Sequence, residues 1–218
     1  VLAAYAIGRR IMLLALMPAW GYSTASSTLV GQSIGAGDDE EATDYGWQTL
    51  RLALATQLLI AAGIILLARP IVLAFDTEYV GLTVEFVRIF GLGVAGFSIS
   101  RTMRGALRGA GDMRWPLYGG LAGTYLVRLP LGAIAVPAGA AALAVGSISI
   151  PLGVTTLSLG GFAFDPGLDL GLVAIYAAIL ADMYVRAAFN TVRFWSGKWR
   201  QVAAESGVGR AGEASETD

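Results

Sequence analysis

Long apolar runs, separated by short polar or glycine-containing breaks, dominate the sequence of this chain. A helix needs about 20 mainly apolar residues to cross the hydrocarbon core of a bilayer. The segments that meet this need are residues 1–30, 50–67, 80–106, 116–136 and 170–192. The pattern predicts an all-α fold, a polytopic membrane helix bundle of about five transmembrane helices. These segments and their connections place one transmembrane unit over residues 1–199.

One stretch between the fourth and fifth segments departs from this pattern. No charged residue lies between Arg128 and Asp165, which leaves room for a sixth crossing. Residues 146–164, however, are rich in glycine, β-branched residues and Ser or Thr, a composition typical of an extended hairpin or a surface loop. We therefore expect five spans and an extracellular loop over residues 137–167, with a re-entrant course of this loop as the alternative.

Composition indicates a membrane protein and removes several classes of function. Hydrophobic residues make up 56% of the chain and charged residues 14%, whereas soluble domains carry about 25% charged residues. A net charge of −1 gives no support to a nucleic-acid partner. The absence of His and Cys removes the commonest metal ligands and thiol nucleophiles. Because Glu85, Asp112 and Asp182 fall at different depths, no enzyme activity, metal site or cofactor is expected.

The tetrapeptide GAGD occurs twice, at residues 35–38 and 109–112, each time at the end of a long apolar segment. Neither copy continues into a dinucleotide-binding or P-loop motif. We expect the glycine to end a helix in a left-handed conformation and the Asp to cap the element that follows. Two crossings separate the copies, so both are expected on the same side of the membrane.

Charge counts assign that side. Four basic residues surround the second GAGD, namely Arg101, Arg104, Arg108 and Arg114, and three follow the fifth segment, namely Arg193, Lys198 and Arg200. The opposite face has Arg69 and, at most, Arg9 and Arg10. Because basic residues concentrate on the cytoplasmic side, we expect a multi-pass plasma-membrane protein with cytoplasmic GAGD loops and C-terminus. The small, polar residues 200–218 are expected to form a disordered cytoplasmic tail.

Several motifs, in order, resemble the C-terminal half of the multidrug and toxic compound extrusion (MATE) transporters. They are the segment over residues 3–38 that ends in GQSIGAGD, then LRGAGDMRWPL, YLVRLPLGA and ADMYVRAAFNTVRFWSGKW. The resemblance implies helices eight to twelve of a twelve-helix fold made of two lobes. The first lobe and the seventh helix would then be supplied by the same chain or by a separate one. Since the chain begins with Val1 inside an apolar run, we expect a fragment.

The resemblance also implies a function. MATE proteins export cationic or amphipathic compounds in exchange for sodium ions or protons by alternating access, with membrane lipid and a small amphipathic substrate as partners. One branch of the family carries a cation-binding carboxylate in the tenth helix, where this chain has Phe97, and residues 91–100 contain no acid. The coupling cation is therefore expected in the missing first lobe.

Ionisable residues inside the predicted spans are the first candidates for a site. Asp182 and Arg186 lie four residues apart, an order that favours pairing on one helix face. The pair is interpreted either as a proton or substrate relay or as a packing pair. Glu85 and Arg88 predict a similar pair near the outer end of the third span, where Glu85 is a candidate for lining the substrate cavity.

The spacing of Arg101, Arg104 and Arg108 places them on one helix face near the cytoplasm. They are interpreted as a cytoplasmic gate or as anchors for anionic lipid headgroups. Arg128 lies deep in the fourth span, two residues before Pro130. It is expected either to clamp carbonyls freed by this proline or to line the cavity.

Two prolines and several aromatic residues complete the candidates. Pro18 and Pro130 are candidate hinges, with a static kink as the alternative. The aromatic residues that would line a cavity for organic cations are Trp20, Tyr22, Tyr118 and Tyr176, of which Tyr176 is retained as a site residue.

Other functions stay open. A flippase for lipid-linked saccharides shares the wider architecture but needs a strongly cationic cavity, for which the sequence offers only Arg128 and Arg186 as inward-facing cations. A membrane-embedded enzyme would need convergent carboxylates. An inactive half-transporter remnant is the remaining alternative.

Overall fold

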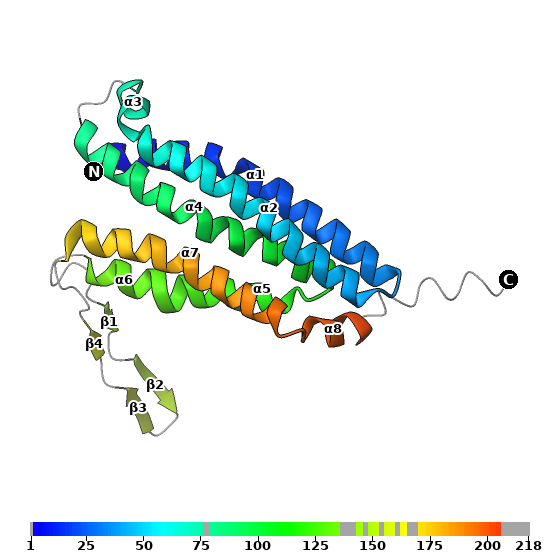
Figure 1. The fold of residues 1–218 in the computed structure, drawn as a ribbon. Helices are drawn as coiled ribbons and strands as arrows, with labels where there is room; N and C mark the ends of the chain where they lie inside the picture. Colours follow the sequence, from blue (N-terminus) through cyan, green and yellow to red (C-terminus); the bar gives the residue numbers. More distant parts are fainter. Residues whose placement is uncertain are drawn as a thin grey trace.

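The computed structural model describes residues 2–75, 79–135, 143–145, 148–152, 155–159, 162–164 and 170–205. Its long helices are α1 (Leu2–Gly35), α2 (Asp39–Leu66), α4 (Val80–Gly109) and α7 (Gly171–Trp195). They run side by side in an elongated bundle, in which α4 contacts α1, α2 and α7 (Figure 1). The short helix α3 (Ala68–Leu73) leads from α2 toward α4. The all-α bundle predicted from the apolar runs is confirmed.

The fourth predicted segment forms a column of three consecutive pieces. These are α5 (Arg114–Leu121), the π-helix η1 (Ala122–Arg128) and α6 (Leu129–Ile134). In the π-helix the hydrogen-bond ladder is shifted, so that the Leu129 N–H donates to the Thr124 carbonyl, five residues earlier. Pro130 follows in the first turn of α6 and supplies no N–H. The sequence placed the irregularity at Pro130, but the structure distributes it over the preceding turns.

Three of the described helices, α2, α4 and α7, are long and apolar enough to cross a membrane. The column α5–η1–α6 is divided into pieces of 8, 7 and 6 residues. The second predicted span is longer than expected, because α2 begins at Asp39 instead of residue 50. Asp38 caps this helix and acidic residues fill its first turn, where the helix dipole favours negative charge.

Short strands interrupt the helical pattern outside the bundle (Figure 1). β1 (Leu143–Val145) pairs antiparallel with β4 (Phe162–Phe164), and β2 (Ile148–Leu152) pairs antiparallel with β3 (Thr155–Leu159). Extended structure therefore occurs where the composition predicted a hairpin or surface loop. The rest of the loop predicted over residues 137–167 lies outside the described residues, and its extracellular placement stays a prediction.

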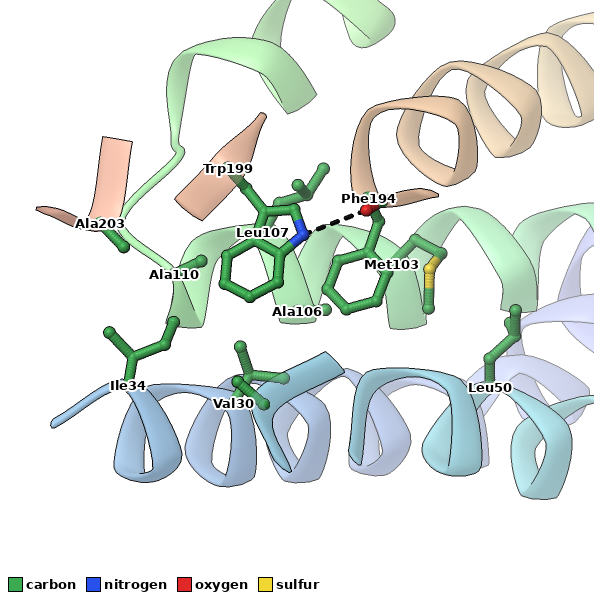
Figure 2. Packing of buried hydrophobic residues seen from close by; sticks show 11 residues of the cluster. Val30, Ile34, Leu50, Met103, Ala106, Leu107, Ala110, Phe194, Trp199 and Ala203 are labelled. Atoms are coloured by element: carbon green, nitrogen blue, oxygen red, sulfur yellow. Dashed lines mark hydrogen bonds between the residues drawn. The ribbon is translucent and has the colours of Figure 1, made fainter. Parts of the chain in front are cut away.

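The prediction of disorder from residue 200 is wrong for the first residues of the tail, which belong to helix α8 (Trp199–Glu205). The ring of Trp199 is fully buried and stacks on Phe194 of α7, with centroids 5.4 Å apart. Figure 2 shows its Nε1 atom donating a hydrogen bond to the Phe194 carbonyl, 3.0 Å away. These contacts anchor α8, and the sequence did not reveal them because they depend on the fold. Residues 206–218 lie outside the described part.

One apolar cluster closes the end of the bundle near α8 (Figure 2). Its buried members are Val30, Ile34, Ala42, Leu50, Met103, Ala106, Leu107, Ala110, Phe194, Trp199 and Ala203. Ile34 precedes the first GAGD turn and Ala110 belongs to the second. Both turns therefore lie at the same end of the bundle, together with the end of α7.

The two GAGD turns have the same geometry. Gly37 and Gly111 have φ values of 77° and 79°, the left-handed region that favours glycine. The following Asp38 and Asp112 N–H groups donate to carbonyls five residues earlier, at 2.9 and 2.8 Å. Each Asp side chain then accepts from an N–H three residues on, at Glu41 and Trp115. The predicted left-handed glycine followed by an Asp cap is confirmed in both copies.

Small residues bring α1 and α4 into close backbone contact. Gly105 and Gly109, one turn apart on α4, face the backbone carbonyls of Ser23 and Ser27, and Gly31 faces Gly109 in return. A Cβ atom at either α4 position would overlap these carbonyls. This small-residue spacing is a common means of close helix packing in membranes.

Replacing Gly105 by Ala tests this packing. The new methyl group would meet the Ser23 backbone, and overpacking of this kind costs about 1–3 kcal/mol. Gly21→Ala is the matched control, because no heavy atom lies within 4 Å of its methyl position. Thermal unfolding of the detergent-purified protein should show a lower Tm for Gly105→Ala alone. Equal Tm values for the two variants would contradict the packing argument.

Candidate functional site

Charged side chains converge on a cavity between α4, η1 and α7. The cavity has a volume of about 210 Å³ and is lined by Phe97, Ser100, Arg101, Arg104, Arg128, Asp182, Met183 and Arg186. It brings together five of the residues that the sequence singled out, from three different helices. Glu85, Tyr176, Arg108 and the two prolines do not line it. We call it the arginine cavity.

The predicted pairing of Asp182 with Arg186 is confirmed. The Arg186 Nε lies 2.6 Å from the Asp182 Oδ1 atom, and the Asp182 residue is 7% exposed. A second nitrogen of Arg186 donates to the Thr124 hydroxyl of η1 at 2.8 Å, a contact that the sequence did not suggest. Gly123 makes this approach possible, since a Cβ there would overlap both charged side chains. Whether the pair acts in a relay stays a prediction.

Arg101 and Arg104 are partly buried in the bundle. The guanidinium of Arg101 lies 5.8 Å from the ring centre of Trp20 and 5.2 Å from that of Phe97. Such cation–π contacts stabilise a charge without using its N–H groups. The Nε atom of Arg104 is buried and has no hydrogen-bond partner among the residues that the structure describes. Both residues line the arginine cavity, whereas their predicted gate or anchor roles stay predictions.

Arg108 follows the same helix face into a neighbouring cavity of about 450 Å³. This cavity shares Arg104 and Arg186 with the arginine cavity, and its remaining lining is mostly apolar: Met113, Pro116, Leu117, Gly120, Leu121 and Thr124. Arg101, Arg104 and Arg108 therefore form a row on α4 along two cavities.

Arg128 does not clamp the helix irregularity near Pro130. Its exposed side chain forms no hydrogen bond or ion pair with any described residue. The carbonyls that Arg128 was expected to bind lie in the π-helix, where the shifted backbone ladder supplies hydrogen bonds such as that from the Leu129 N–H to the Thr124 carbonyl. Arg128 lines the arginine cavity and a further cavity of about 470 Å³, whose other lining residues include Leu129, Ile175 and Ile179.

The predicted pair of Glu85 and Arg88 does not form, since the described residues contain no ion pair between them. Glu85 instead accepts a hydrogen bond from the Tyr176 hydroxyl of α7 at 3.2 Å. The Tyr176 ring packs edge-on against Phe86, with centroids 5.2 Å apart. A residue on a neighbouring helix therefore replaces the partner expected three positions along the chain. Glu85 and Arg88 line a separate cavity together with Arg69.

The other aromatic candidates have structural partners. The Tyr22 hydroxyl lies 2.7 Å from the Thr56 hydroxyl of α2. Tyr118 packs edge-on against Trp115, with centroids 6.4 Å apart. Trp20 contacts Arg101 and in this way lies near the arginine cavity.

Pro18 lies inside the continuous helix α1. Beside it, the fully buried Gln57 of α2 faces the backbone of α1. With its amide nitrogen toward the Ala15 carbonyl (3.1 Å) and its amide oxygen toward the Ala19 N–H (3.2 Å), Gln57 satisfies backbone groups around the proline. Such a bridge holds the proline region against α2. A hinge at Pro18 would have to break it.

A second ion pair was not predicted from the sequence. Arg193 of α7 lies 2.7 Å from the Asp112 carboxylate, whose side chain is 3% exposed. The Arg193 guanidinium also lies 4.9 Å from the Trp115 ring, and Trp115 donates to the Phe189 carbonyl at 3.0 Å. These contacts fasten the second GAGD turn to α7. The charges are far apart in sequence, so no local spacing indicated the pair.

Within the described residues, no group of three or more acidic, His or Cys side chains is placed to hold a metal ion. The residues that line the arginine cavity include neither a nucleophile beside a base nor paired carboxylates. The chemistry of this cavity is that of recognition by charge, hydrogen bonding and apolar contact.

Comparisons with known proteins give a consistent result. The MatE family profile matches residues 1–134. The chain is 28% identical over 203 residues to a probable multidrug resistance protein NorM of Thermotoga maritima, covering 92% of this chain and 38% of that protein. It is 27% identical over 135 residues to multidrug and toxin extrusion protein 1 of Homo sapiens, covering 60% of this chain and 23% of that protein.

A solved structure shares the fold. The eukaryotic MATE transporter AtDTX14 superposes with a TM-score of 0.67 at 16% sequence identity, covering 93% of this chain and 40% of that chain. The described fold is therefore that of part of such a transporter. The chain spans well under half the length of each of these proteins.

A double-variant series tests the Asp182–Arg186 pair. Asp182→Asn leaves Arg186 without its counter-charge and should lower stability by about 3 kcal/mol, near the lower end for a broken buried pair. Replacing both residues, as Asp182→Leu with Arg186→Met, should recover much of this loss, because no uncompensated charge remains. Thermal unfolding in detergent measures the effect, with the exposed Asp44→Asn as control. A double variant less stable than Asp182→Asn would contradict the pairing argument.

Proposed function

We propose that this chain, which belongs to the MatE family of multidrug efflux transporters, forms part of a secondary active antiporter. The antiporter exports cationic or amphipathic compounds in exchange for sodium ions or protons by alternating access. The observation that carries the proposal is the match of the MatE family profile to residues 1–134, and the fold shared with AtDTX14 over 93% of the chain agrees with it. Members of this family are transporters and not enzymes.

We assign the chain to helices eight to twelve, in the C-terminal lobe, because its motifs follow one another in the order found in that half of MATE transporters. The five helical columns then correspond to five membrane spans, of which α2, α4 and α7 meet the length and composition of a span. The chain covers 38% of the NorM relative from Thermotoga maritima. The remaining lobe would come from the same polypeptide or from a second one, and it would bind the coupling cation.

The topology follows from the same assignment. Both GAGD turns and the end of α7 gather in one apolar cluster, which supports their placement on one side of the membrane. The basic residues near these turns make that side the cytoplasm. In this orientation the arginine cavity lies toward the cytoplasmic half of the lobe, and Glu85 with Tyr176 lies toward the outer half.

Substrate contacts are proposed in both the cytoplasmic half and the outer half of the lobe. Arg128, Asp182 and Arg186 line the arginine cavity, and the Tyr176–Glu85 hydrogen bond presents the carboxylate available for a cationic substrate in the outer half. Phe97 lines the arginine cavity at the position where one branch of the family has a carboxylate. This supports a coupling site elsewhere in the transporter.

Efflux from reconstituted vesicles tests this function. The full protein, inserted into proteoliposomes, should export a cationic dye such as ethidium when a sodium or proton gradient is imposed, and should stop when an ionophore collapses the gradient. Protein-free vesicles and vesicles without a gradient are the controls. Dye movement that ignores both gradients would reject antiport, and the absence of dye movement under either gradient would favour an inactive remnant.

One observation favours the flippase of lipid-linked saccharides as a second candidate. The sequence offered only Arg128 and Arg186 as inward-facing cations, but Arg101 and Arg104 line the same cavity. The cationic surroundings that a diphosphate needs are thus better supplied than expected. Rescue of cell-envelope glycan synthesis in a flippase-depleted strain would support this candidate, and absence of rescue alongside gradient-driven dye export would exclude it.

A further inference from the structure

The arginine cavity has an excess of positive charge. Its ionisable lining residues are the four arginines Arg101, Arg104, Arg128 and Arg186 and a single carboxylate, Asp182. Asp182 forms an ion pair with Arg186. The other three guanidinium groups have no carboxylate partner among the described residues. Within the part of the chain that the structure describes, the cavity therefore has three cations without a carboxylate partner.

The positions of these cations are fixed by contacts that leave donors free. The rings of Trp20 and Phe97 flank Arg101 at 5.8 and 5.2 Å, so its orientation is held while its N–H groups stay unused. The Nε of Arg104 is buried without an acceptor among the described residues. Buried donors of this kind are rare in proteins, and a bound ion or water commonly accepts from those that occur.

Mutual repulsion adds to this excess. Like charges gather around Arg104, since Arg101 and Arg186 line the arginine cavity with it and Arg108 lines the neighbouring cavity that Arg104 shares. An arrangement of like charges in a membrane protein is costly unless a counter-charge enters. Guanidinium groups match the geometry of oxyanions, to which they donate two parallel hydrogen bonds. The missing counter-charge is therefore best supplied by an oxyanion.

Apolar surface adjoins the charges on two sides. The cavity shared by Arg104 and Arg186 continues along Met113, Leu117 and Leu121. The cavity shared by Arg128 continues along Leu129, Ile175 and Ile179. A ligand with an anionic head and an apolar body could place its head among the arginines and its body in either neighbour.

We propose that the arginine cavity binds the oxyanion head of an amphipathic anion, with phosphate monoesters as the best-fitting class. Arg101 and Arg104 supply free donors, Arg128 adds a charge at the exposed side, and Asp182 holds Arg186 in place. A cationic head in the same position would face three unpaired guanidinium groups. The site thus differs in charge from the cation export proposed for the whole transporter, and it does not rest on that function.

Binding of two matched probes tests the charge preference. The full protein in dodecyl maltoside is titrated by calorimetry with phenyl phosphate and with phenyltrimethylammonium, which share a ring and differ in charge. Phenyl phosphate should bind at least about tenfold more tightly, and Arg104→Gln should weaken it about tenfold or more, the scale of a lost charge-assisted hydrogen bond. Equal binding of the two probes would overturn the proposal.

Matched variants separate charge from folding. Arg51→Gln removes an exposed arginine of α2 that does not line the cavity and should leave phenyl phosphate binding unchanged. Arg104→Lys retains the charge and should keep more affinity than Arg104→Gln at an equal Tm. If Arg104→Gln does not fold, Arg128→Gln replaces it, because the exposed Arg128 side chain has no described partner. Unchanged binding in the folded neutral variant would also reject the site.

A competition experiment identifies the source of the anion. Nanodiscs of phosphatidic acid, whose headgroup is a phosphate monoester, should block phenyl phosphate binding if a lipid headgroup is the natural occupant, whereas phosphatidylcholine nanodiscs should not. If neither lipid competes while phenyl phosphate still binds, the occupant is a soluble amphipathic anion. Because calorimetry measures binding at equilibrium, a failure of gradient-driven dye efflux would leave these results intact.

Discussion

Within a bilayer no water replaces a hydrogen bond that a helix loses, and this constraint explains the irregular features of the fold. Pro18 removes a donor from α1, and the buried amide of Gln57 lies against the backbone beside it. Near Pro130 the ladder itself shifts, so that η1 closes its bonds over five residues. At both GAGD turns, a left-handed glycine lets the following N–H groups reach back to the helix end. At each of these irregular positions, another group of the protein therefore forms a hydrogen bond with the backbone.

Charged side chains inside the bundle also need partners from the protein, and only some of the arginines have one. Arg193 is matched by Asp112 at the end of α7, and Arg186 is matched by Asp182 in its middle. Gly123 allows the second pair to be covered by η1, because any larger side chain would displace it. Arg104, by contrast, keeps a buried donor without an acceptor among the described residues. Six buried side-chain polar atoms lack a partner among the described residues, and that of Arg104 is the one that belongs to a charged group, for which an unmet hydrogen bond costs most.

Features that depend on neighbours in sequence were predictable, and those that depend on neighbours in space were not. The GAGD turns and the Asp182–Arg186 pair involve residues no more than six positions apart, so their patterns are readable in the chain. Glu85 was expected to form an ion pair with Arg88, three residues along the chain. The packing of α7 instead places the Tyr176 hydroxyl within hydrogen-bond distance of Glu85.

The cavity itself shows the same limit. Arg101 and Arg104 lie near the end of α4, which suggested a surface position, yet α7 packs against α4 and Arg128 of η1 lines the same cavity, so both arginines are partly buried. The helix α8 is a further example, because the burial of Trp199 depends on Phe194 and on the end of α4. The composition of the polar tail contains no sign of these contacts.

The charge of the arginine cavity also constrains how a cation could pass through this lobe. Two like charges 4 Å apart repel by about 4 kcal/mol at the effective dielectric constant found near protein surfaces. A cationic substrate that entered would meet several such interactions, and the nearest carboxylate, Asp182, is already bound to Arg186. Under the proposed function, the cationic group of a substrate is therefore recognised by other surfaces, such as Glu85, and the arginines contact its polar or anionic parts.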